Sequence, residues 1–188
     1  MTRSSLVAGL TALLYVVAAL PVVVGGGYGV TSGKVAVASL VLCAALVALS
    51  TIDTETFLLP DSITLPLVVV GLLMPWGTGA AAHIERALAA ALGFALLWGV
   101  AWFYESWRGR SGLGMGDAKL FAAAGAWLGL EALATVLGYA AIAALASVAV
   151  ARLRGGSVSW AARIPFGPYL AFAIWMVWLY GPLGFAPE

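Results

Sequence analysis

The chain has 188 residues, of which 63% are hydrophobic and 9% are charged, and its formal net charge is +1. Soluble domains carry about 25% charged residues, so this composition excludes an ordinary water-soluble protein. The small net charge gives no reason to expect nucleic acid or an acidic partner. We therefore expect an all-α protein, a polytopic bundle of transmembrane helices that forms one membrane-embedded domain over residues 1–188.

Apolar runs of about 17–25 residues are the sequence signal for membrane-spanning helices. Seven such candidates follow one another along the chain: Leu6–Val24, Val35–Ile52, Ser62–Trp76, Ala87–Tyr104, Ala118–Leu130, Ala132–Leu153 and Pro168–Tyr180. The glycine turn Gly25–Gly27 closes the first run, which at about 19 residues is longer than a signal peptide's apolar core and favours a retained span. The fifth run is short for a span, so the count falls to six if it does not cross the membrane.

The distribution of Lys and Arg in the short loops predicts the orientation of the bundle. With the N-terminus in the cytoplasm, seven of the nine basic residues fall on the inner side and two, Lys34 and Arg86, fall on the outer side. This topology places the C-terminus outside. It also places the loops at 53–60 and 106–116 together on the cytoplasmic face.

Acidic residues are rare in this chain, and three aspartates fall at or beside the ends of predicted spans: Asp53, Asp61 and Asp117. Ionisable groups in or near hydrocarbon are costly and therefore mark function by default. Each aspartate also has a structural interpretation, because Asp53 could end a helix in headgroup water, and Asp61 and Asp117 could cap the helices that follow them. We expect three of the other acids to be solvated outside the membrane: Glu85, Glu131 and Glu188.

Asp53 and Asp117 belong to different predicted helices but to one membrane face. Two carboxylates that share a site cannot easily both ionise, so one becomes an acid and the other a base near neutral pH. Such a pair can activate water and protonate an amide leaving group. No Ser-His or Cys-His set competes for that role, because His83 lies in a predicted outer loop and Cys43 lies in mid-span. A single cysteine also excludes a CxxC metal site.

The residues before Asp117 read Gly-Leu-Gly-Met-Gly, with glycines at positions 112, 114 and 116. Gly112, Gly114 and Gly116 permit unusual backbone angles and the close approach of another chain. That property suits an extended substrate lying beside the carboxylate. The run does not match a phosphate-binding loop, which requires GxxxxGK[ST] after a strand.

Three blocks of this sequence resemble the type IV prepilin peptidases, a family of GxGD intramembrane aspartyl proteases. The blocks are IDTETFLLPDSITLPL at 52–67, GLGMGDAKLFAAAGAWLG at 112–129 and IPFGPYLAFAIW at 164–175. Their order matches the family, and so does the separation of the two key aspartates. The resemblance extends over most of the chain, from about Leu6 to Tyr180.

The resemblance implies that Asp53 and Asp117 are the catalytic pair and that no metal or organic cofactor is needed. It implies a supporting role for Asp61, and it makes Lys119 a local charge partner for a carboxylate or for phospholipid. The start of the last span could also be set simply by its two prolines. The remaining residues of the implied site are Gly112, Gly114, Gly116, Pro165, Gly167 and Pro168.

The implied reaction is removal of the leader peptide from a prepilin or pseudopilin precursor at the cytoplasmic face of the inner (plasma) membrane. The apolar segment of that precursor would lie beside the bundle in membrane lipid, and no nucleic acid is involved. Many family members carry an additional N-terminal domain, often with a four-cysteine zinc site, that methylates the new N-terminus. With one cysteine and no room before Leu6, we expect that domain, and N-methyltransferase activity, to be absent.

Two other functions remain open from the sequence. A proton- or cation-coupled transporter could use the same aspartates, but it would place them near the bilayer midplane and not at span ends. The chain could also be a degenerate family member that serves as an assembly factor. The presence of both aspartates and of all three glycines argues against that interpretation.

Overall fold

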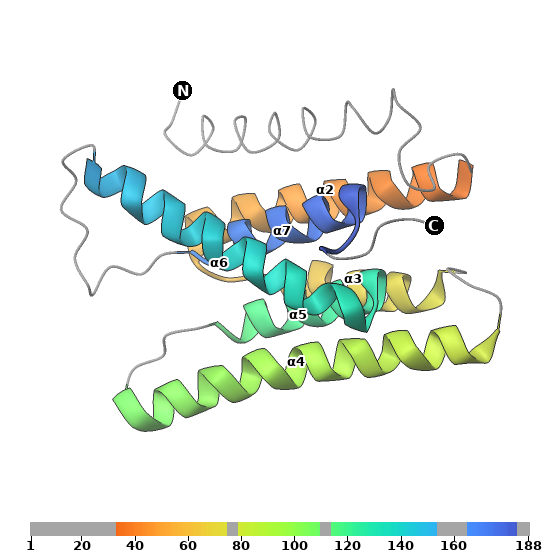
Figure 1. Cartoon of the computed structure of the whole chain (residues 1–188), viewed down its shortest axis with the longest axis horizontal. Coiled ribbons are helices and arrows are strands. Elements are labelled where there is room, and N and C mark those ends of the chain that lie inside the picture. The colour runs from red at the N-terminus through yellow and green to blue at the C-terminus, as the bar shows by residue number, and fades with distance from the viewer. Residues whose placement is uncertain (1–32, 75–78, 110–113, 154–164, 184–188) are drawn as a thin grey trace.

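The computed structural model describes residues 33–74, 79–109, 114–153 and 165–183; the first predicted span, Leu6–Val24, and the turn Gly25–Gly27 lie outside this set. Every regular element in the described part of the chain is a helix, which confirms the all-α fold class (Figure 1). The helices, in chain order, are α2 (Gly33–Thr56), α3 (Asp61–Leu73), α4 (Ala80–Arg108), α5 (Met115–Leu128), α6 (Leu130–Leu153) and α7 (Gly167–Tyr180).

Three of the described helices contain segments long and apolar enough to cross a membrane: Val37–Thr56, Ala80–Arg108 and Leu130–Val150. The segments Asp61–Leu73 and Gly167–Tyr180 are apolar but shorter. A helix of about 14 residues is roughly 21 Å long, which is less than the roughly 30 Å of the hydrocarbon core. The helices therefore suit an integral membrane bundle, and the number of spans stays a prediction.

The largest difference from the expected boundaries occurs in α4, which begins at Ala80 and not at Ala87. The predicted span began at Ala87 because Glu85 and Arg86 interrupt the apolar sequence just before it. In the structure, however, both of these side chains contact the ends of other helices. Glu85 Oε1 accepts a hydrogen bond of 2.7 Å from the Leu130 N–H at the start of α6. Arg86 donates one of 2.5 Å to the Trp127 carbonyl at the end of α5. Charged residues can thus extend α4 because they satisfy backbone groups that would otherwise be unpaired.

His83 was expected in an outer loop, but it lies on the same extension of α4. The ring is exposed, and its Nδ1 lies 3.1 Å from the Leu72 carbonyl near the end of α3. Glu85 was expected to be solvated, and it is exposed as well as bonded to α6. A hydropathy pattern cannot anticipate these contacts, because each joins two separate helices.

The short helix α5 lies at the centre of the bundle, with ten of its 14 residues buried and with α3, α4, α6 and α7 packed around it. Small residues allow this close packing. A Cβ atom on Gly125 would lie 2.5 Å from the backbone of Ala89 in α4, and one on Gly71 in α3 would lie 2.5 Å from the Trp127 ring. Helix α5 is therefore held on several sides.

Consecutive helices run in opposite directions, so their connections alternate between the two ends of the bundle. The end of α2 and the starts of α3, α5 and α7 lie at one end, which is the left side of Figure 1. In the two loops that charge counting placed on one face, the described residues Leu59 and Gly116 contact each other at this end. All of the described candidate site residues belong to these helix ends or to the residues next to them.

Candidate active site

Asp53 lies on α2, one helical turn before the helix ends at Thr56, and its side chain is buried. Its Oδ2 accepts a hydrogen bond of 3.1 Å from the backbone N–H of Gly167, the first residue of α7. A Cβ atom on Gly167 would lie 2.6 Å from this oxygen, so only glycine fits without a shift of one group. The resemblance placed Gly167 among the residues of the implied site, but its contact with Asp53 was not predicted.

Asp117 is the third residue of α5 and is also buried. Its Oδ2 accepts a hydrogen bond of 3.3 Å from the Gly114 N–H, and its own N–H donates one of 3.1 Å to the Gly114 carbonyl. The cap of α5 is Gly114, and Asp117 stabilises the first turn from its third position by accepting the bond from the Gly114 N–H. The sequence interpretation of Asp117 as the cap itself is therefore wrong, although its side chain does contribute to the start of the helix. The other oxygen, Oδ1, is buried without a hydrogen-bond partner in the described part of the chain.

The two carboxyl groups lie close enough to interact electrostatically. Asp117 lies outside the three candidate spans, and its pKa is raised from 3.8 to about 6. Burial is the largest cause, the negative charge of Asp53 adds to it, and the hydrogen bond from Gly114 opposes both. Near pH 6 this arrangement favours a carboxyl pair that can share one proton.

The raised pKa of Asp117 leads to a prediction about stability. A carboxyl whose pKa is higher in the folded state than in the unfolded state loses its stabilising contribution as pH rises from 3.8 through about 6. We therefore expect Asp117→Asn to be more stable than the wild type at pH 7.5, by about 3 kcal/mol at most. The two proteins should be about equally stable near pH 4. Thermal unfolding in detergent at both pH values measures the difference, and an equal gap at both would contradict this account.

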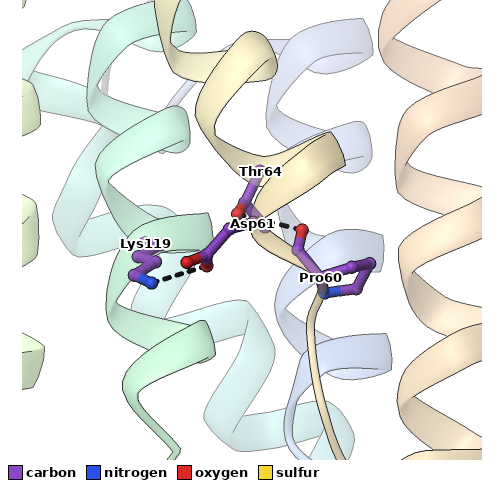
Figure 2. Close-up of polar contacts among 4 residues, drawn as sticks. All are labelled: Pro60, Asp61, Thr64 and Lys119. Carbon is purple, nitrogen blue, oxygen red and sulfur yellow. Dashed lines mark hydrogen bonds and ion pairs between the residues drawn. The ribbon is translucent and has the colours of Figure 1, made fainter.

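Asp61 is the first residue of α3, and the helix cap is the preceding residue, Pro60. The Pro60 carbonyl accepts hydrogen bonds from the N–H groups of Ile63 and Thr64 and from the Thr64 hydroxyl. The Asp61 carboxylate instead points toward α5, where it forms an ion pair of 2.5 Å with Lys119 (Figure 2). Asp61 was considered a possible cap from the sequence, and that interpretation is wrong. Lys119 was expected to pair with a carboxylate or with phospholipid, and in the structure it pairs with the Asp61 carboxylate.

The glycine run differs from expectation in its backbone angles. Gly114 has φ −76° and ψ 144°, which any residue can adopt, and Gly116 does not have a positive φ either. Of Gly114 and Gly116, only Gly116 is closely approached by another segment of the chain. A Cβ atom on Gly116 would lie 2.8 Å from the Leu59 Cβ in the α2–α3 connection. At Gly114 the nearest atom would be 3.4 Å away. Gly112 lies outside the described residues.

The two prolines lie where a helix start accommodates them. Pro165 precedes α7, and Pro168 occupies its second position, where a missing N–H costs nothing. Their simple structural role is therefore supported, while Gly167 between them contacts Asp53.

Phe57 is a residue near the site that sequence reasoning missed. It follows α2 with a φ of 54°, and it is the one described residue other than glycine with a positive φ. Its N–H donates a hydrogen bond of 2.9 Å to the Asp53 carbonyl. Helices commonly end with a left-handed residue, but that residue is usually glycine or asparagine. An aromatic residue in this conformation costs on the order of 1 kcal/mol, and no pattern in the sequence indicates it.

No group of three or more His, Cys, Asp or Glu side chains that could hold a metal occurs within residues 33–74, 79–109, 114–153 and 165–183. Two buried carboxyl groups, those of Asp53 and Asp117, lie at this end of the bundle. Asp53 is held by α7, Asp117 is held by its own helix turn, and the α2–α3 connection is fixed against α5 by Leu59 and by the Asp61–Lys119 pair.

The sequence model of the type IV leader peptidase family matches residues 40–149. Two similar proteins are both named prepilin leader peptidase/N-methyltransferase. The protein from Burkholderia pseudomallei strain 1026b is 47% identical over 137 residues, which cover 72% of this chain and 44% of the relative. The protein from Aeromonas salmonicida strain A449 is 41% identical over 180 residues, which cover 95% of this chain and 58% of the relative. A protein of that name in Pseudomonas aeruginosa is 40% identical over 146 residues, 77% of this chain and 49% of the relative. The chain spans about half the length of these relatives, and no solved structure matches it significantly.

Proposed function

The chain belongs to the type IV leader peptidase family, and on that basis we propose that it is a membrane aspartyl endopeptidase. Its substrates are prepilin-like precursors, prepilins or pseudopilins, from which it removes the leader peptide. The observation that carries the proposal is the pair of buried carboxyl groups, Asp53 and Asp117, which come from different helices and interact electrostatically.

In the proposed reaction the two carboxyl groups share one proton. Asp53 is the ionised partner, because the Gly167 N–H at the start of α7 stabilises a negative charge on its Oδ2. Asp117 holds the proton, which its burial favours. Asp53 removes a proton from a water molecule whose oxygen attacks the scissile carbonyl carbon, and Asp117 protonates the carbonyl oxygen. Asp53 then gives the proton that it took from water to the leaving amide nitrogen, and Asp117 recovers a proton from a hydroxyl group of the tetrahedral intermediate. The C–N bond breaks, a carboxyl group and an amine result, and both aspartates return to their starting states.

The proposed location is the inner (plasma) membrane with the site at its cytoplasmic face. The starts of α3, α5 and α7 lie together at one end of the bundle, and charge counting predicts seven of the nine basic residues on that side. The apolar segment of the precursor would lie in membrane lipid beside the helices. The reaction requires no cofactor or metal, and methyl transfer, which the names of the relatives include, is not part of this proposal.

The proposal is tested by co-expressing the chain with candidate prepilin-like precursors and measuring leader removal by mass spectrometry. We expect the precursor to lose its leader with the wild type and to keep it with the Asp53→Asn/Asp117→Asn double variant. Failure to cleave any precursor of the class would contradict the proposal. Proton or cation flux in proteoliposomes driven by a pH gradient, without cleavage, would support a transporter in its place.

A further inference from the structure

The turn that follows α2 holds an exposed aromatic side chain in a conformation that disfavours it. Phe57 has φ 54°, and its side chain is 48% exposed. Asparagine or glycine would adopt this left-handed position more readily. Because the ring is half-exposed, packing within the described part of the protein does not fully account for an aromatic residue here. A residue kept in a strained conformation near a candidate active site suggests a function for its side chain.

The surroundings of this turn connect it to both carboxyl groups. The Phe57 N–H is bonded to the backbone of Asp53, and Leu59, two residues later, packs against Gly116, which precedes Asp117. Two further apolar side chains are exposed in these segments: Leu58 is 71% exposed and Met115, in the first turn of α5, is 55% exposed. We call Phe57, Leu58 and Met115 the apolar rim. It belongs to the same two segments of chain that carry the candidate catalytic pair.

We propose that Phe57 is a specificity-determining residue and that the apolar rim receives the apolar segment of the precursor immediately beside the scissile bond. The inference rests on the proposed function and deepens it. The occupant follows from the chemistry of the rim, which presents three apolar side chains within five residues of a catalytic carboxylate. Burying an aromatic ring against an apolar substrate side chain is favourable, and it would offset the strain of the turn.

The test compares the detergent-solubilised full chain carrying Phe57→Asn, Phe57→Gly or Phe57→Leu with the wild type. Two precursors are used, one with Phe and one with Ser directly after the scissile bond. Leu73→Asn is the matched control, because Leu73 is 74% exposed at the far end of α3. Initial rates give KM and kcat for each pair, and thermal unfolding reports whether each variant is folded.

For the Phe precursor we expect Phe57→Asn and Phe57→Gly to raise KM roughly tenfold, the size of losing one modest apolar contact, with little change in kcat. For the Ser precursor the change should be less than about twofold, and Phe57→Leu should lie between the wild type and Phe57→Asn. Phe57→Asn should unfold at the wild-type temperature or above it, because the strain is relieved. Leu73→Asn should leave both KM values unchanged.

Three results would overturn the inference. Unchanged KM values in Phe57→Asn would mean that the ring does not touch the substrate. An equal rise in KM for both precursors would mean that Phe57 does not read the residue beside the scissile bond. Poorer recovery of Phe57→Asn in membranes with unchanged KM would make the ring a lipid contact. If the wild type cleaves neither precursor, the proposed function itself fails and this inference falls with it, so the two failures are distinguishable.

Discussion

Replacing either Asp53 or Asp117 by asparagine is expected to lower kcat for leader cleavage by roughly a thousandfold, the usual contribution of a positioned acid or base. Asparagine has nearly the same shape, so it can still accept the hydrogen bonds from Gly167 or Gly114, but it cannot exchange the proton. Because the two carboxyl groups act as one unit, the double variant should lose little more activity than either single variant. Initial rates on a purified precursor measure the effect.

Glu55→Gln is the matched control for this experiment. Glu55 lies in the last turn of α2, two residues after Asp53, but it is exposed. Removing its charge should change kcat by less than about twofold, as for a surface substitution. Undiminished cleavage by both single aspartate variants would exclude the pair as the catalytic groups. Loss of cleavage in Glu55→Gln as well would point to a charge requirement of the whole helix end and not of the pair.

Gly167→Ala is expected to lower kcat by roughly a hundredfold, because a displacement of about 1 Å in a reacting group has an effect of this size. The added Cβ would lie 2.6 Å from Asp53 Oδ2 and 2.9 Å from its Cγ, distances too short for any real contact. Either the carboxylate or the start of α7 must therefore move, and either movement changes the geometry of the 3.1 Å hydrogen bond. The rate of leader cleavage and the unfolding temperature are measured together.

Gly138→Ala is the control for glycine replacement. Gly138 lies on α6, and a Cβ there would meet nothing within 4 Å. This variant should keep wild-type activity and gain up to about 1 kcal/mol of stability, because alanine is the better helix former. A Gly167→Ala protein that cleaves at the wild-type rate would show that the position of the Asp53 carboxylate is not critical to the reaction.

Much of the fold was predictable because it depends on properties that are local in the chain. A charged fraction of 9% is too small for a water-facing surface, and the apolar runs predicted the six described helices. The family was also predictable, because its motif places Asp53, Asp117 and the glycines at characteristic separations. The extension of α4 was not predictable, because Glu85 and Arg86 are tolerated there only through the ends of α5 and α6 that they cap.

The sequence by itself determined that this chain is an all-α membrane-type bundle and which two carboxylates are the candidates for catalysis. Only the tertiary structure decided what holds Asp53, because the Gly167 N–H that bonds to it lies 114 positions away. The tertiary structure also decided that Lys119 pairs with Asp61, 58 positions away. Spacing within one helix specifies which residues share a face. It does not specify which residue of another helix will meet them, because that choice is made by close packing around α5, where a single added Cβ would not fit.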